Sequence, residues 1–147
     1  MAEQQNYSNH TRWFPLFHFV IVPLLLLNLL EHLVRIYLTT GSERIEQAFW
    51  SLLSVVLILL ALVARLMAIK VQDRVIRLEE RLRYREVLSA ETAAKASELP
   101  VEQIIALRFA SDGELNDLVN QVLDGKLTTQ KEIKMAIKDW RGDYLRV

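Results

Sequence analysis

Four polar residues in the first apolar stretch of the chain carry side chains that could bind ions or transfer protons. They recur at the spacing i, i+3, i+4 and i+7, which places them on one helix face: Asn28, Glu31, His32 and Arg35. Ionisable groups in a helix that lies in lipid are candidates for an ion or proton site. Ser54 and Arg65, in the second apolar stretch, are the residues that would complete such a site.

A purely structural interpretation explains the same residues. Glu31 and Arg35 form an i,i+4 ion pair in the favourable order, and Arg65 can extend its guanidinium toward an interface. Residues 14–30 alone would be about 26 Å long as a helix, which nearly spans the hydrocarbon layer. We therefore favour an interfacial position for Glu31, His32 and Arg35. A hairpin that turns between the two stretches should also place Glu31 opposite Ser54.

The residues offer no arrangement suited to catalysis or metal binding. His18 and His32 would lie about 21 Å apart along a helix, too far to share a metal ion in one chain. A serine hydrolase built on Ser54 would lack a glycine-rich oxyanion element. The absence of cysteine excludes disulfides and thiolate ligands. We expect a protein that is not an enzyme and that binds no metal or cofactor.

The two apolar stretches that carry these residues, about 14–37 and 48–69, are each long enough to cross a bilayer. A span needs roughly 20 predominantly apolar residues, and aromatic residues flank both stretches where interfacial belts are expected. Residues 13–70 are thus predicted to form a transmembrane hairpin. A soluble hairpin would need a larger chain to cover it. A cleaved signal peptide would need a basic start, and only Arg12 precedes the first stretch.

Basic residues directly after the second stretch predict the orientation of the hairpin. Six of them lie within residues 70–85: Lys70, Arg74, Arg77, Arg81, Arg83 and Arg85. By the positive-inside rule this side is cytoplasmic, and an even number of spans puts the N-terminal segment 1–12 there too. Lys70 and Arg74 are the candidate contacts with anionic lipid headgroups. The connection 39–47 is then predicted to lie outside.

The cytoplasmic half is predicted to begin as a continuation of the second span. No glycine or proline interrupts residues 71–88, and Val71, Val75, Leu78 and Leu82 follow one another at the a/d spacings of a coiled coil. This seam either pairs with another protomer or packs on downstream helices. Residues 89–98 form a linker or short helix, and residues 99–147 a small helical domain. Ser111 and Glu114 have capping-box spacing there, and Trp140 ends the apolar stripe of the last predicted helix.

Several stretches of the chain together resemble one family. They are Asn9–Arg12, Val71–Leu82, Leu107–Asp112 with Glu114–Leu115, Trp140–Arg141 and Arg146–Val147. The chain resembles a family of small two-span bacterial membrane proteins classed as a domain of unknown function. That resemblance implies a bacterial inner-membrane protein and brings no activity, substrate or catalytic residue with it.

The sequence therefore predicts an all-α membrane protein: a two-helix transmembrane hairpin, a cytoplasmic stalk that extends its second helix, and a small helical bundle. We expect a non-enzymatic, membrane-anchored scaffold or interaction protein of the inner membrane. Its partners would be the lipid bilayer and either copies of itself or a larger membrane complex, but neither nucleic acid nor a small-molecule ligand. The candidate interaction surface comprises Val75, Leu78, Leu82 and Trp140. The alternatives are an oligomeric channel that uses the polar face of the first span, and an accessory subunit that offers Arg65 to lipid headgroups.

Overall fold

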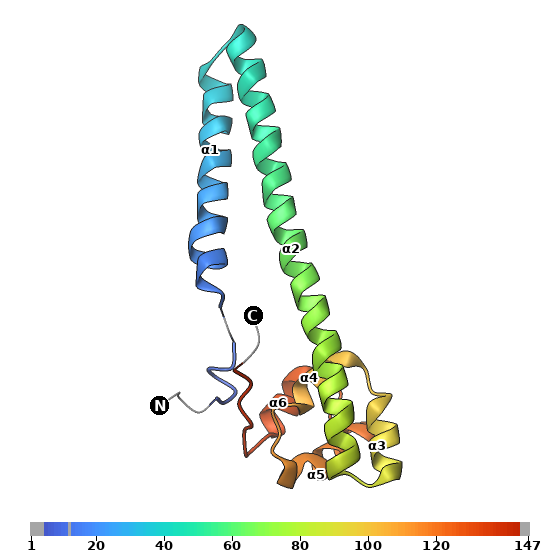
Figure 1. Ribbon diagram of the computed structural model, residues 1–147. Coiled ribbons are helices and arrows are strands. Elements are labelled where there is room, and N and C mark those ends of the chain that lie inside the picture. Colours follow the sequence, from blue (N-terminus) through green and yellow to red (C-terminus); the bar gives the residue numbers. More distant parts are fainter. Residues whose placement is uncertain (1–4, 12, 145–147) are drawn as a thin grey trace. The chain divides into compact units, whose positions relative to one another are not determined.

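The computed structural model describes residues 5–11 and 13–144, and the regular elements in this part of the chain are all helices, as predicted (Figure 1). Its elements are η1 Leu16–Ile21, α1 Val22–Leu38, α2 Gly41–Val87, α3 Ala90–Ser97, α4 Val101–Leu107, α5 Asp112–Leu123 and α6 Gln130–Ala136. These residues divide into two compact units. The hairpin unit comprises residues 13–69, and the helical unit comprises residues 5–11 together with 70–144.

The first helix of the hairpin unit starts with a wide turn. Residues Leu16–Ile21 form a π-helix, and Pro23 follows it in the first turn of α1. Because proline has no backbone N–H, it fits at a helix start but cannot continue the regular i→i−4 ladder from the residues before it. The π-helix and α1 together give an unbroken helical segment of 23 residues that is apolar enough to cross a membrane.

The turn of the hairpin is much tighter than the sequence suggested. We predicted a connection over residues 39–47, but α1 ends at Leu38 and α2 already begins at Gly41. Gly41 has a φ of 63°, which glycine adopts without the steric penalty of a Cβ atom. The side chain of Arg44 donates from Nε to the carbonyls of Ile36 and Thr39, so carbonyls left open at the end of α1 gain a partner.

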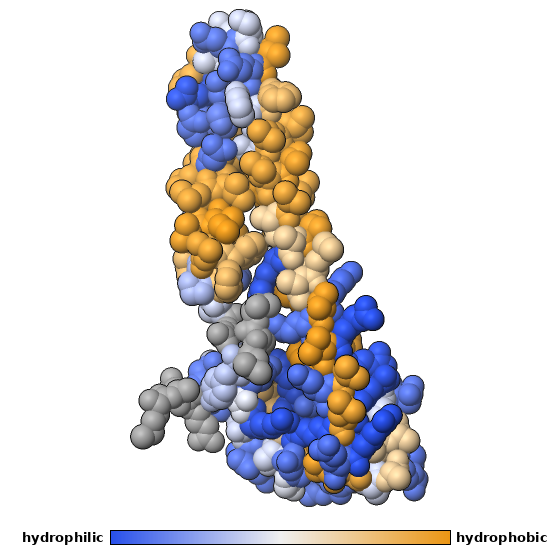
Figure 2. All heavy atoms as spheres, in the orientation of Figure 1, coloured by the Kyte–Doolittle hydropathy of each residue, from blue (hydrophilic) through white to orange (hydrophobic). Residues whose placement is uncertain are grey.

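Helix α2 is 47 residues long and continues without a break from the apolar stretch through the charged one to Val87. This confirms the prediction that no residue between the second apolar stretch and residue 88 interrupts the helix. Its apolar part, like the first helical segment, is long and apolar enough to cross a membrane. Figure 2 shows apolar side chains over most of the hairpin unit and hydrophilic ones over most of the helical unit.

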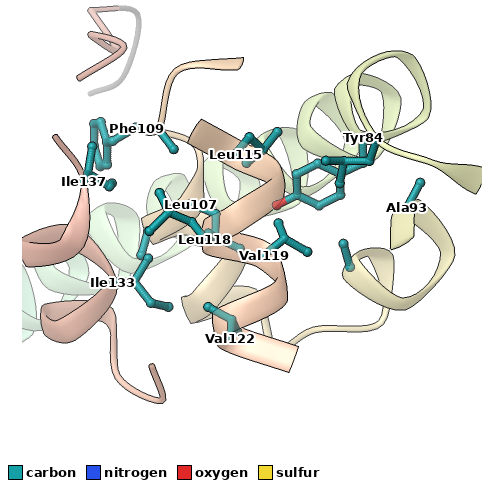
Figure 3. Packing of buried hydrophobic residues seen from close by; sticks show 14 residues of the cluster. Tyr84, Ala93, Leu107, Phe109, Leu115, Leu118, Val119, Val122, Ile133 and Ile137 are labelled. Atoms are coloured by element: carbon teal, nitrogen blue, oxygen red, sulfur yellow. The ribbon is translucent and has the colours of Figure 1, made fainter. Parts of the chain in front are cut away.

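The helical unit has one apolar core, to which α2 and the short helices contribute (Figure 3). Its fully buried members include Tyr84 from α2, Ala96 from α3, Leu107 from α4, Leu115 from α5 and Ile133 from α6. Because Ala93 and Ala96 are buried in this core, residues 89–98 form a helix that belongs to the packed unit rather than a bare linker.

Side-chain caps fix the ends of these short helices. Ser89 caps α3, and Thr129 and Glu132 form a reciprocal capping box at α6. The capping box expected at Ser111 and Glu114 does not form. Instead the Glu114 carboxylate accepts hydrogen bonds from the backbone amides of Lys138 and Asp139, at 3.1 and 3.2 Å. It therefore ties α5 to the segment that follows α6.

The last predicted helix is shorter than its apolar stripe. It ends at Ala136, and Trp140 lies beyond it in an antiparallel bridge with Ala110. The Trp140 ring is 5.1 Å from the ring of Phe109 and packs against the core. Trp140 is therefore not on a helix, and its half-buried ring packs against the core of the helical unit.

Candidate functional site

The polar residues of the hairpin unit join α1 to α2 instead of lining a common cavity. Ser54 is 2% exposed, and its hydroxyl donates to Oδ1 of Asn28 at 2.7 Å. The prediction that Glu31 lies opposite Ser54 is therefore wrong. The true partner lies about one helical turn further from the hairpin turn, because the tight turn at Thr39 and Thr40 shifts the pairing of the two helices.

A second polar contact lies one turn closer to the hairpin turn. Nδ1 of His32 lies 2.8 Å from the amide oxygen of Gln47, and the His32 ring stacks on Trp50 with 6.2 Å between ring centroids. Glu31 forms an ion pair with Arg35 and also lies 3.2 Å from Nδ1 of His32. Sequence reasoning missed Gln47 and Trp50, because we placed the start of the second helix too late to pair them with His32.

Through these contacts, Asn28, Ser54 and His32 of the candidate intramembrane cluster connect α1 to α2. Arg65 lies about three turns beyond Ser54 along α2 and is half-buried. Among the described residues, no group of three or more His, Asp or Glu side chains is arranged to hold a metal ion. Polar side chains that bond across two packed helices hold them in register, and Asn28, Ser54 and His32 have such positions.

The stalk seam is exposed along its whole length. The exposed fractions of Val71, Val75, Leu78 and Leu82 are 61%, 48%, 61% and 52%. Of the two possibilities left open by the sequence, packing of the seam on the chain's own downstream helices is therefore wrong. The other face of α2 contributes Tyr84 to the core, and Leu88, which directly follows α2, is buried there too. Figure 2 shows a row of apolar side chains crossing the hydrophilic surface of this unit.

The candidate headgroup contacts are also on the surface. Lys70 and Arg74 are both exposed, and neither takes part in an ion pair within the described part of the chain. Neither residue is needed to hold the helical unit together. Both are therefore free to interact with something outside it.

A partly buried ionic cluster around Arg83 joins α2 to the start of α5 and to the loop before it. Arg83 is 8% exposed, and its guanidinium donates to the Asp112 carboxylate at 2.7 Å, the Ala110 carbonyl at 2.7 Å and Glu80 at 3.1 Å. We call this set of residues, with Arg108, Arg141 and Asp143, the ionic clasp. Sequence reasoning missed it, because charges on a stalk helix are usually solvated.

The rest of the clasp holds the C-terminal segment. Arg108 forms an ion pair with Asp143 at 3.0 Å, and Arg141 lies 3.6 Å from Glu80. Burial raises the pKa of Glu80, although the neighbouring arginines Arg83 and Arg141 act in the opposite direction. The open hollow beside the clasp is lined by three acidic and three basic residues, so it offers no net charge to select an ionic ligand.

The N-terminal segment packs on the rest of the helical unit, a contact that no sequence pattern indicated. The Gln5 side chain and the Asp143 backbone exchange two hydrogen bonds, at 2.8 and 3.2 Å. The His10 ring lies 5.9 Å from the rings of both Phe109 and Trp140. We call residues 5–11 the N-terminal strap. They belong to the same compact unit as residues 70–144, although the whole hairpin separates them in sequence.

Comparison with known proteins gives a family but no activity. No curated protein matches the chain, and no solved structure matches it. All 147 residues do match a family model whose description is a family of unknown function, DUF6526. The match includes the strap, the seam and the clasp, and the description of the family names no substrate. The chain belongs to the family of unknown function DUF6526.

Proposed function

We propose that this chain is an integral membrane protein of two spans that acts as a non-enzymatic scaffold at one face of the bilayer. The N-terminal strap is the observation that carries this proposal. Residues 5–11 and residues 70–144 pack in one unit, and the apolar hairpin of residues 13–69 lies between them in sequence. A chain that enters a bilayer from such a unit must return to the same side, which needs an even number of spans.

The exposed surface of the hairpin unit supports insertion in lipid. Large apolar side chains along both helices are more than half exposed: Leu24, Leu27, Leu30, Leu52, Leu59 and Leu60. Contiguous apolar surface of this extent is rare on a soluble protein, whereas lipid tails cover it without cost. The polar contacts of Asn28 with Ser54 and of His32 with Gln47 face the partner helix. This is where polar groups of a membrane hairpin belong.

The basic residues after the hairpin support an orientation with the helical unit in the cytoplasm. Lys70 and Arg74 are exposed, and Arg85 follows on the same helix. Positive charges close to the ends of spans are retained on the cytoplasmic side. We therefore propose a bacterial inner-membrane location, with the strap and the helical unit cytoplasmic and the turn at Gly41 outside.

The absence of cysteine makes the topology directly testable. Thr11→Cys, Ser42→Cys and Ala94→Cys each place one thiol at an exposed position. A membrane-impermeant maleimide applied to intact cells should label Ser42→Cys alone, and inverted vesicles should show labelling of Thr11→Cys and Ala94→Cys. Release of the protein by alkaline carbonate, or labelling of Thr11→Cys and Ala94→Cys from opposite sides, would overturn the proposal.

An oligomeric channel is the second candidate, and one observation favours it. The side chains of Glu31 and Arg35 remain 45% and 59% exposed on α1, so several copies could direct them toward a shared axis. Ion flux into liposomes that contain the purified protein tests this. A flux that Glu31→Gln abolishes would support the channel, and an absence of flux in the wild type would remove it.

A further inference from the structure

The seam on α2 is a row of apolar side chains that the described part of the chain leaves uncovered. Its four side chains are about half exposed or more, whereas Ile76 and Tyr84 on the other side of the helix are buried. Covering the exposed part of these Val and Leu side chains would be favourable, because it removes apolar surface from water. This inference rests on the proposed function, because insertion of both hairpins in one membrane is what would hold the two copies parallel.

The spacing of the seam is that of a two-stranded coiled coil. Val75 and Leu82 occupy a positions, and Val71 and Leu78 occupy d positions. A β-branched residue at a followed by leucine at d, as in Val75 and Leu78, favours two strands over three or four. Counted backward along the same helix, the next a and d positions are Ala68 and Ala64, both exposed. Small residues there let two helices approach closely in lipid.

We propose that the seam binds the seam of a second copy, so that two α2 helices pair in parallel from Ala64 to Leu82. Two copies inserted in the membrane with the same orientation have parallel α2 helices. The stalk alone offers only two heptads, fewer than the three or four typical of a self-sufficient coiled coil. Insertion in the bilayer compensates for the short length, because it aligns the two helices and confines them to a plane.

Charge complementarity identifies the occupant as a second copy. In a parallel pair, a g residue faces the e residue five positions further along the other helix. Arg74 is at g and Glu79 is at e, so each Arg74 would face Glu79 of the partner subunit. Both side chains are exposed, and neither forms an ion pair within the described part of the chain. Arg81 and Glu86 repeat the pattern one heptad later, although Arg81 also donates to the Ser97 carbonyl.

Disulfide trapping in native membranes tests the pairing. Val75→Cys and Leu82→Cys each place a single thiol in the seam, and Ala94→Cys places one at an exposed position of α3 as a control. All three sites are on the surface, so the substitutions leave the core intact. Mild oxidation should convert the two seam variants to covalent dimers and leave the control monomeric. Dimer yields no higher than that of Ala94→Cys would overturn the proposal.

Charge exchange distinguishes a second copy from an unrelated partner. In the Val75→Cys background, Arg74→Glu alone or Glu79→Arg alone places like charges opposite each other at two symmetric positions. Each should lower the dimer yield about threefold to tenfold, given the modest strength of exposed ion pairs. The double exchange recreates the pairs and should restore the yield. Failure of the double exchange to restore it, or trapping of a different protein by the seam cysteines, would contradict the proposal.

The topology labels keep the two proposals separate. If Thr11→Cys and Ala94→Cys are labelled as expected but the seam thiols do not link, pairing fails and membrane anchoring stands. If those labels are reached from opposite sides, the anchoring proposal fails first.

Discussion

Arg83 shows how a charged residue on a stalk helix becomes part of a protein interior. Its guanidinium reaches two carboxylates and the Ala110 carbonyl, and it is almost inaccessible to water. The sequence contains the local half of this arrangement, the i,i+3 pair Glu80 and Arg83. It does not contain the other half, because Asp112 lies 29 residues further along the chain. Sequence patterns predict helix faces well and long-range polar contacts poorly.

Arg83→Ala should destabilise the helical unit strongly. The substitution removes the closest cation from the buried Glu80 carboxylate and leaves it only the more weakly acting Arg141 and Arg108, and breaking a buried pair on one side costs about 3–5 kcal/mol. Replacing both Glu80 and Arg83 by leucine should lower the free energy of unfolding less than Arg83→Ala alone, because the buried Glu80 carboxylate is then not left without its partner. Urea unfolding of the full chain in detergent measures both. Arg85→Ala, at an exposed site, is the control, and an equal loss for it and Arg83→Ala would refute the buried role.

Glu132 gives a prediction with a definite pH dependence. The backbone amide of Thr129, then that of Thr128 and its hydroxyl, donate to the Glu132 carboxylate and lower its pKa from 4.5 to about 2. A folded-state pKa below the unfolded one adds stability above the unfolded pKa, and this is lost as the pH falls through the folded pKa. Glu132→Gln should therefore lower the thermal unfolding midpoint at pH 6, with a difference from wild type that shrinks between pH 4.5 and 2. A pH-independent difference would contradict the cap.

At the scale of elements, the sequence predicted the helices themselves better than their ends. The uninterrupted α2 was predictable because residues 71–88 contain neither glycine nor proline. The early start of α2 at Gly41 was missed, because polar residues before Phe49 suggested a loop. The sequence left open whether the seam would be exposed. It is exposed because Tyr84, on the opposite face of α2, packs into the core instead.

The N-terminal strap is an element that no local pattern predicts, and its contact with Trp140 can be tested. His10→Ala should uncover the Trp140 ring, because the His10 ring packs against both Trp140 and Phe109. In a background with Trp13→Phe and Trp50→Phe, the emission of Trp140 should shift to longer wavelength. Ser8→Ala is the matched control, since its side chain bonds only to the neighbouring Asn6. Identical spectra for both variants would show that the strap does not cover Trp140.

At the scale of the whole chain, the strap restricts the topology of the hairpin, and the seam offers a surface for another molecule. The strap brings residues 5–11 to the unit of residues 70–144. If the hairpin crosses a bilayer, both of its ends must therefore lie on the same side of it. The seam faces away from the buried side of α2, so it is available to another molecule without any rearrangement of the helical unit. The strap thus finds its partner within the same chain, whereas the seam remains exposed and could bind another molecule.

If the partner is a second copy held in the same bilayer, the extent of pairing should depend on the density of protein in lipid. Lys126→Cys provides an exposed site for donor and acceptor dyes on the helical unit, away from the seam. Energy transfer between labelled copies in vesicles should fall when empty lipid is fused in at constant protein concentration. It should stay constant when the same vesicles are diluted with buffer, because the copies remain confined to their membrane. Energy transfer that falls on dilution with buffer would indicate association through water and would contradict pairing within the bilayer.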